Sequence, residues 1–372
     1  MFIARLSQYL LESLFNSYGD NFDIERFRSS RPLRKRILSR LEHIAKKPFH
    51  LLGIFTRNDV FDRRNRVSFE SWIPYFSELE WLYSALEDEE SKSLLVAIIA
   101  YRILGHRHVK LPLSNPEYWK KIQEISKLAK DGKRLPTGQG AGGFELVLQD
   151  LVTLGYPLKM FMPAGGPMHT FILEQYACRR MGVFVKPGDV VIDAGACWGD
   201  TALYFAHLAG PSGRVYSLEF VQENIDIFEV NLSLNLDLKS RIELVKQPLW
   251  NSSGLRMQNE GAGPGASATL QSSPAGDDST YSISIDDLVQ QKAIPRVHFI
   301  KMDIEGSEME ALKGAVNTLS QHKPDLALCV YHSKQDFTRL ARFVDGLGVG
   351  YRFALGHFTI HKEETVLYAT TR

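Results

Sequence analysis

Hydrophobic and polar positions change their rhythm near the middle of the chain. Beyond residue 186, short runs rich in β-branched residues alternate with stretches in which apolar residues recur at helical spacing. Strands are predicted at 190–192, 215–218, 242–245, 297–300, 326–330 and 365–368, and helices at 224–235, 307–319 and 334–347. This alternation is typical of an α/β fold with a mainly parallel sheet and helices on both faces.

The first part of the chain follows a different pattern. Helical spacing interrupted by prolines predicts a mostly helical N-terminal domain over residues 1–135. The glycine-rich stretch 137–143 lacks the Gly-Lys-Ser/Thr ending of a phosphate-binding loop, so 136–170 is predicted to be a linker and connecting segment. A second domain is predicted over 171–372. Within it, residues 251–280 are rich in Gly, Ser, Pro and Ala, and we expect a flexible insertion there.

The composition is that of an ordinary globular protein. Of 372 residues, 44% are hydrophobic and 23% are charged, which excludes collagen-like, disulfide-scaffold and wholly disordered chains. No apolar run reaches the roughly 18 residues of a membrane span, and the N-terminus lacks the pattern of a signal peptide. The three cysteines lie far apart and form no even framework. We therefore expect a cytoplasmic protein without a transmembrane segment.

Charge is spread unevenly along the chain. The net charge is only +1, yet residues 26–66 hold thirteen basic side chains against three acidic ones. Such a segment is either a solvated surface or a binding site for an anionic partner, such as nucleic acid, a membrane surface or a phosphorylated substrate. We favour the solvated surface.

The stretch 190–201 carries the clearest chemical motif. It reads Val-Val-Ile-Asp-Ala-Gly-Ala-Cys-Trp-Gly-Asp-Thr, a buried strand that enters a tight turn. Gly195 and Gly199 let the backbone approach a ligand, and ligands bind at the carboxyl ends of parallel strands. A dinucleotide site has Gly-x-Gly-x-x-Gly instead. The carboxylate of Asp193 would repel a pyrophosphate but suits a cationic amino-acid ligand. Glu219 ends the next strand, where it can accept both hydroxyls of a ribose.

These residues, together with Lys301-Met-Asp-Ile-Glu-Gly-Ser-Glu308, resemble the FkbM family of S-adenosylmethionine-dependent methyltransferases over about residues 170–370. The resemblance implies the class I methyltransferase fold, a Rossmann-like seven-stranded sheet whose last strand is antiparallel. It implies S-adenosylmethionine as cofactor and S-adenosylhomocysteine as product. It also implies O-methylation of a hydroxyl on a saccharide, glycolipid precursor or natural product.

The resemblance also implies which residues hold the cofactor. The glycine turn would hold the methionine portion, Glu219 the ribose, and Phe220 would flank the adenine. The expected cofactor-binding residues are Asp193, Gly195, Ala196, Cys197, Trp198, Gly199, Asp200, Thr201, Glu219, Phe220, Pro248, Leu249, Trp250 and Asp303. Two have alternatives in packing: Trp198 either stacks near the sulfonium or packs on the helical domain, and Trp250 either closes the adenine pocket or belongs to the core.

Proton chemistry is expected at the same edge of the sheet. An alcohol is a poor nucleophile near neutral pH, so a general base is expected. Asp303 and Glu305 follow the fourth predicted strand, His332 follows the fifth, and His357 precedes the last. We expect His332 to be the base because a neutral imidazole titrates nearest physiological pH. Asp303, Glu305 and His357 are the further catalytic candidates, and Asp303 alternatively holds the ammonium of the cofactor.

A metal site is considered and not favoured. The same four side chains offer oxygen and nitrogen ligands for Mg²⁺ or Mn²⁺. No short-range ligand spacing supports a metal, so none is expected.

Two other functions stay open at this point. One is a nucleic-acid methyltransferase that uses residues 26–66. The Asn/Asp-Pro-Pro-Tyr/Phe motif of base amino-methylases is absent at 303–306, which argues against it. The other is a non-catalytic cofactor-binding scaffold. The favoured partner is a small-molecule or saccharide acceptor; the oligomeric state is left open, and a homo-oligomer is included.

Overall fold

A central sheet organises the protein in a computed structural model that describes residues 1–23, 63–139, 142–271 and 280–372. The sheet has seven strands in the order β12-β13-β11-β10-β4-β5-β6. These strands are β4 (Val190–Ala194), β5 (Arg214–Leu218), β6 (Ile242–Val245), β10 (Phe299–Met302), β11 (Asp325–Cys329), β12 (Arg352–His357) and β13 (Thr365–Thr370). The five strands from β6 to β11 pair in parallel, and β13 is antiparallel to both neighbours. The predicted sheet and its antiparallel last strand are confirmed.

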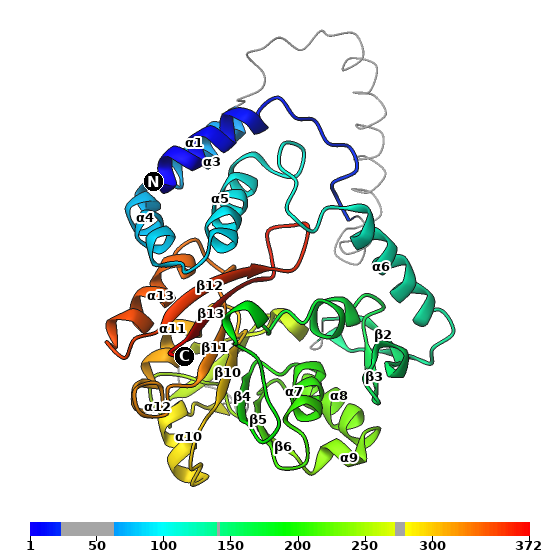
Figure 1. Cartoon of the computed structure of the whole chain (residues 1–372). Helices are drawn as coiled ribbons and strands as arrows, with labels where there is room; N and C mark the ends of the chain where they lie inside the picture. The colour runs from blue at the N-terminus through cyan, green and yellow to red at the C-terminus, as the bar shows by residue number, and fades with distance from the viewer. Residues whose placement is uncertain (24–62, 140–141, 272–279) are drawn as a thin grey trace.

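Helices cover both faces of this sheet (Figure 1). One face carries α7 (Asp200–Ala209), α8 (Gln222–Ser233) and α9 (Leu236–Lys239), and the other carries α10 (Ile285–Gln291), α11 (Glu308–Lys313), α12 (Val316–His322) and α13 (Asp336–Gly346). Each face has its own cluster of buried side chains, because the strands are apolar on both sides.

The structure differs from the predicted elements at two places along this sheet. Strand β12 was missed, since its apolar run is short, contains Gly356 and has no β-branched residue. The single helix expected at 307–319 is two helices, α11 and α12. They separate at Gly314, where a Cβ would overlap the carbonyl oxygen of Trp250.

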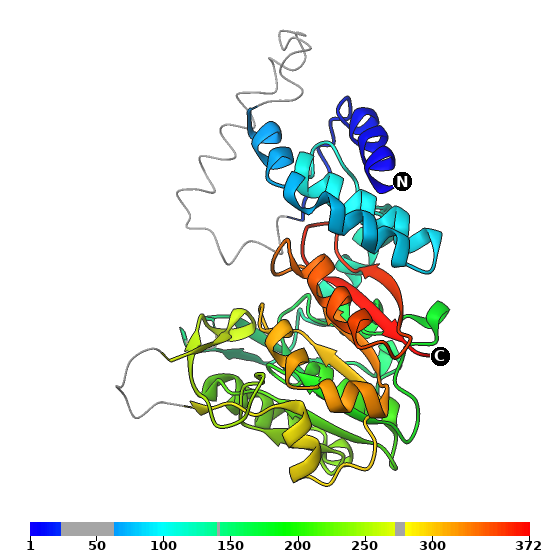
Figure 2. The ribbon, with the colours of Figure 1, turned by 90° about the vertical axis from the view of Figure 1, so that its left-hand side faces the viewer.

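The described part of the N-terminal region is helical, as expected. Its helices are α1 (Phe2–Ser13), α3 (Arg63–Glu70), α4 (Phe76–Ala85), α5 (Glu89–Leu104) and α6 (Pro116–Leu128). Helices α1, α4 and α5 share a core with the sheet. Figure 2 shows α1, α3, α4 and α5 stacked beyond the β12–β13 edge. Leu95 and Ile99 of α5 belong to the same buried cluster as Leu355 of β12. In the described parts of the chain, no helix combines the length and apolarity needed to cross a membrane. Most of the basic segment 26–66 lies outside these parts.

The segment expected to be a linker contains regular structure. Strands β1 (Arg134–Pro136), β2 (Glu145–Asp150) and β3 (Lys159–Met162) form an antiparallel sheet within it. Asn231 of α8 holds β3 in place: it accepts from the backbone N–H of Phe161 at 2.7 Å and donates to its carbonyl at 3.0 Å. Of the glycines that suggested a linker, Gly138, Gly142 and Gly143 lie between β1 and β2 in the described structure.

The insertion at 251–280 also has strands. Antiparallel β8 (Ser267–Leu270) and β9 (Thr280–Tyr281) flank β7 (Arg256–Glu260). Gly261 turns the chain with φ of 89°, and a Cβ there would meet the carbonyl oxygen of Gly265 at 2.5 Å. Residues 272–279 lie outside the described structure. The flexibility of this insertion stays a prediction. Residues 256–270 are not an irregular loop, however, because they contain the paired strands β7 and β8.

Candidate active site

A cleft lies where β4, β5 and β10 end. It encloses about 520 Å³ when the space open to solvent at its mouth is counted. Its walls are Gly195, Cys197, Leu218, Glu219, Phe220, Gln247, Pro248, Leu249, Gly263, Pro264, Ala266, Ala268, Asp303, Ile304, Glu305 and Ser307. The cleft therefore gathers side chains from three strand ends and from the 251–280 insertion.

Two glycines shape the turn that follows β4. Gly195 has φ of 77°, and a Cβ there would overlap the carbonyl oxygen of Asp303, so only glycine lets these two strand ends meet. Gly199 has φ of 88°, and a Cβ there would overlap the ring of Phe228 on α8. Helix α7 begins directly after it, at Asp200. Glycine is therefore needed at both positions for the chain to turn from the sheet into α7.

Asp193 does not line the cleft, contrary to its expected contact with the methionine portion. It is fully buried below the turn, where it accepts from Thr201 Oγ1 at 2.9 Å and from Ser217 Oγ at 3.3 Å. Lys301 Nζ lies 3.3 Å from its carboxylate and donates to the carbonyls of Ala194 and Gly195 at 2.9 and 2.7 Å. Burial alone would lower the pKa of Lys301, but Asp193 raises it. The buried pair therefore supports the turn from beneath.

Glu219 lines the cleft, as its expected role requires. Its Oε1 accepts from the backbone N–H groups of Phe220 at 2.7 Å and Val221 at 2.8 Å. Its Oε2 has a longer contact, 3.4 Å from the side-chain amide of Asn224. Burial raises the pKa of Glu219 above its usual value, although these N–H donors oppose the shift. The carboxylate is therefore fixed in place. Its ionised form is disfavoured by burial until further hydrogen-bond donors reach it.

Several other expected cofactor ligands lie outside the walls of the cleft. Trp198 packs edge-on against Phe144, with ring centroids 5.4 Å apart, and therefore neither lines the cleft nor packs on the helical domain expected over 1–135. Asp200 accepts from Thr170 Oγ1 at 2.8 Å. Ala196 and Thr201 are buried, and Trp250 is half-buried away from the walls. The glycine turn thus meets the cleft through Gly195 and Cys197 only.

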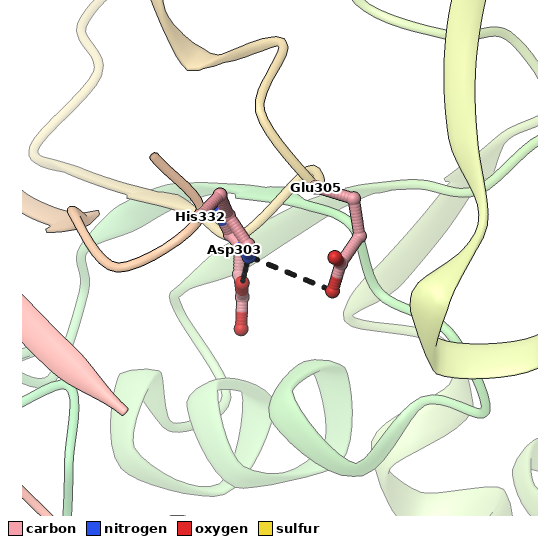
Figure 3. A group of neighbouring side chains, drawn as sticks. All are labelled: Asp303, Glu305 and His332. Carbon is pink, nitrogen blue, oxygen red and sulfur yellow. Dashed lines mark ion pairs between the residues drawn. The ribbon is translucent and has the colours of Figure 1, made fainter. Parts of the chain in front are cut away.

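Asp303, Glu305 and His332 come together at one end of the cleft (Figure 3). His332 Nε2 lies 3.3 Å from Asp303 Oδ1 and 3.5 Å from Glu305 Oε1. On the other side of the ring, Nδ1 lies 3.1 Å from Glu308 Oε1. Asp303 also accepts from the hydroxyls of Tyr176 at 3.0 Å and Tyr331 at 3.1 Å. The ends of β10 and β11 therefore place one imidazole among three carboxylates.

This charge arrangement differs from the one expected for His332. Burial alone would lower the pKa of the imidazole, but Asp303, Glu305 and Glu308 together raise it well above its usual value. Burial would likewise raise the pKa of Asp303, yet His332 and Lys301 hold it far below the usual range. A free imidazole that titrates near neutral pH, the reason for choosing His332 as base, is not what these surroundings provide.

His357 does not join this group. It ends β12, and its Nδ1 lies 2.8 Å from Thr365 Oγ1 while its Nε2 lies 2.9 Å from the carbonyl oxygen of His361. Both ring nitrogens therefore have partners at the far edge of the sheet. The expected catalytic role of His357 has no support in this geometry.

Three residues that contact the site were not singled out from the sequence. Tyr176 lies far from Asp303 in the sequence, and nothing local marks it. Lys301 carried a signal, because a charged residue inside an apolar strand needs a buried partner. Asn224 is buried on α8; it accepts from Trp198 Nε1 at 3.1 Å and donates to the carbonyl of Gly263 at 3.1 Å. It therefore connects Glu219, the turn and the insertion.

Comparison with known proteins finds a family model that matches the part of the chain that holds this site. The model of the methyltransferase FkbM domain matches residues 193–353, which include the glycine turn, Glu219, Asp303, Glu305 and His332. No curated protein matches the chain.

Two solved structures are similar to this chain to different degrees. The crystal structure of methyltransferase FkbM from Methylobacillus flagellatus KT is 21% identical, with a TM-score of 0.52, and the match covers 81% of this chain and 60% of that one. This chain thus spans about 60% of the length of that protein. Aeropyrum pernix fibrillarin, solved with natively bound S-adenosyl-L-methionine, is 13% identical with a TM-score of 0.37; the match covers 62% of this chain and 90% of fibrillarin. The seven-stranded sheet and its two helical layers form the class I methyltransferase fold.

Proposed function

We propose that the protein binds S-adenosylmethionine in the cleft and methylates a hydroxyl group on a saccharide, glycolipid precursor or other natural product. The match of residues 193–353 to the model of the methyltransferase FkbM domain supports this function. One observation carries this proposal. A single cleft has Glu219 and the Gly195 turn among its walls, and Asp303 and Glu305 among the others. A cofactor side and an acceptor side thus meet in one space.

The residues of the cofactor side fit S-adenosylmethionine. Glu219 would accept the ribose hydroxyls, since Oε1 is held by backbone donors and the contact of Oε2 with Asn224 is long, at 3.4 Å. Phe220, Pro248 and Leu249 offer apolar surface for the adenine. Gly195 presents only its backbone to the cleft, so the methionine portion would lie against its main chain.

The acceptor side has to orient a hydroxyl and remove its proton. S-adenosylmethionine supplies a methyl group bound to a positively charged sulfur. Asp303 and Glu305 are oxygen acceptors on the wall of the cleft, so they can receive hydrogen bonds from an acceptor hydroxyl. Alignment of this kind contributes roughly 7–11 kcal/mol in favourable cases. We therefore assign acceptor binding to the whole Asp303–Glu305–His332 cluster rather than to His332 alone.

Calorimetry tests the cofactor directly. We expect saturable binding of both S-adenosylmethionine and S-adenosylhomocysteine and no binding of NAD. Binding of NAD without either sulfur compound would refute the proposal.

The acceptor side is tested by transfer of a labelled methyl group to a panel of saccharides and hydroxylated natural products. His332→Ala should lower turnover by orders of magnitude and leave the affinity for S-adenosylhomocysteine nearly unchanged. If affinity for the product falls instead, His332 belongs to the cofactor side. If neither changes, the cluster does not hold the acceptor.

A further inference from the structure

We propose that Asp303, Glu305 and His332 form a binding site for one divalent metal ion. The three ligand atoms come from two adjacent strand ends and lie within 4.8 Å of one another. Asp303 and Glu305 line the cleft, so the ion would lie on its acceptor side. Figure 3 shows the two carboxylates directed toward the same edge of the imidazole ring.

The distances suit an octahedral ion. Metal–oxygen bonds of about 2.1 Å at right angles place neighbouring ligand atoms about 3 Å apart. In this structure His332 Nε2 lies 3.3 Å from Asp303 Oδ1 and 3.5 Å from Glu305 Oε1. Small rotations of these side chains would close the remaining difference. The three atoms can therefore occupy adjacent positions around one ion.

The imidazole itself is an independent indication. The side chain of His332 is 8% exposed, and its Nε2 lies within ion-pair distance of both carboxylates but makes no hydrogen bond of acceptable geometry to any described residue. A buried polar atom without a well-aligned hydrogen bond is costly, and a metal ion would remove that cost at Nε2. Nε2 faces the two carboxylates that would share the ion.

Glu308 supports the same assignment from the other side of the ring. Its Oε1 lies 3.1 Å from Nδ1 and also accepts from the backbone N–H of Ile304 at 2.9 Å. A carboxylate near one ring nitrogen favours a proton there, and the metal ion would displace the proton from the other nitrogen when it binds. Its position behind the ring is the usual one for an outer-sphere partner of a ligating histidine.

The ligand types indicate which ions fit. Two carboxylates and one imidazole combine the oxygen preference of Mg²⁺ and Mn²⁺ with the nitrogen preference of later metals, and Mn²⁺ accepts both. Three protein ligands leave positions open for other oxygens. On the proposed function, an acceptor with two neighbouring oxygens, such as a saccharide diol, would fill two of them. That role rests on the proposed function, whereas binding of the ion does not.

The site is tested by titrating the full-length, chelator-treated protein with MnCl₂ and following free Mn²⁺ by electron paramagnetic resonance. We expect one saturable Mn²⁺ per chain. Glu305→Gln should weaken that binding by at least about tenfold, and Glu308→Gln by about 10–100-fold. Glu305 is the most exposed ligand, with 31% of its side chain accessible, so its substitution perturbs folding least.

Glu310→Gln is the matched control. Glu310 lies on the same helix as Glu308, but its carboxylate pairs with Lys313. The Glu310→Gln variant should bind Mn²⁺ with the same affinity as the unaltered protein. Absence of saturable binding in millimolar Mn²⁺, or equal affinity in Glu305→Gln, would overturn the site.

Calorimetry with S-adenosylhomocysteine on the same samples separates this inference from the proposed function. Product binding without Mn²⁺ binding overturns the metal site alone. Mn²⁺ binding without product binding supports the metal site and counts against the function.

Discussion

At the residue scale, the buried pair of Lys301 and Asp193 explains how a charged strand residue is tolerated. Their side chains are 1% and 0% exposed. Removing one partner from such a pair leaves an uncompensated buried charge, which costs about 3–5 kcal/mol. Lys301→Met should therefore lower the free energy of unfolding by that amount in chemical denaturation.

The double variant D193N/K301M checks the cause of this loss. It contains no uncompensated charge, so it should recover part of the stability lost in Lys301→Met. Recovery will be incomplete, because the carbonyls of Ala194 and Gly195 still lose their donor. A double variant that is less stable than both single variants would show that the ion pair does not explain the effect.

Glu219 links ligand affinity to pH. Burial raises its pKa in the ligand-free protein, whereas ribose hydroxyls would donate to the ionised form and lower it. Binding should therefore release a proton at pH values below that raised pKa. Affinity for S-adenosylhomocysteine should fall as the pH drops through the pKa of Glu219 and stay constant above it.

Glu219→Gln supplies the comparison. It should bind the product about tenfold more weakly near neutral pH, because hydrogen bonds to a charged group contribute roughly 1.5–3 kcal/mol. Its affinity should no longer change with pH over the acidic range. Calorimetry in buffers of different ionisation enthalpy measures the proton release, and an equal pH dependence in Glu219→Gln would exclude Glu219 as its source.

The residues that sequence predicts here are those whose roles are local. Gly195, Glu219 and Asp303 each end or follow a strand, and a parallel sheet brings its strand ends to one edge. Asp193 has the same sequence context, yet it points below the turn because Lys301 and Thr201 hold it there. Lys301 and Thr201 lie on other elements than Asp193, so the spacing of residues within a strand could not predict these contacts.

At the element scale, α8 connects two small sheets to the site through two buried asparagines. Asn224 donates to Gly263 in the insertion, and Asn231 exchanges hydrogen bonds with Phe161 in β3. Asn224→Ala should accelerate amide exchange at 256–270 and weaken product binding several-fold, because it frees both Glu219 and the insertion.

Asn231→Ala is the matched control, since it removes the same side chain from the same face of α8, about two turns further along. It should accelerate exchange at 159–162 and leave 256–270 unchanged. Hydrogen exchange with mass spectrometry distinguishes the two patterns. Equal exchange at 256–270 in Asn224→Ala and in the unaltered protein would contradict the proposed link.

Elements were predicted well where the pattern was strong and poorly where glycine dominated. The parallel strands are runs of β-branched and aliphatic residues, and the structure confirms them. The segments at 136–170 and 251–280 are rich in glycine, which reads as loop, yet both contain strands. Their strands are stabilised by contact with α8 and the cleft, and tertiary contact of this kind overrides local propensity.

At the scale of the whole molecule, the N-terminal helices and the sheet are predicted to unfold as one unit. A boundary near residue 135 followed from the change in pattern, but the structure shows one continuous apolar cluster across it. Helix α5 is buried on nearly all sides, since almost every residue from Leu94 to Leu104 is inaccessible to solvent. The sequence pattern shows that α5 and β12 are apolar but not that they pack against each other, so the shared core could not be predicted.

Truncation tests this continuity. A chain of residues 171–372 would expose the faces of Phe353 and Leu355 that α5 covers, and it would lose the hydrogen bonds from Arg102 Nη2 to the carbonyls of Tyr331 at 3.2 Å and Lys362 at 2.7 Å. Tyr331 precedes His332, so the acceptor side of the cleft would lose support as well. We expect the truncated chain to bind a hydrophobic dye and to unfold without a sharp transition, whereas the full chain unfolds cooperatively. A truncated chain that unfolds sharply at the same temperature and binds S-adenosylhomocysteine with full affinity would show two independent domains instead.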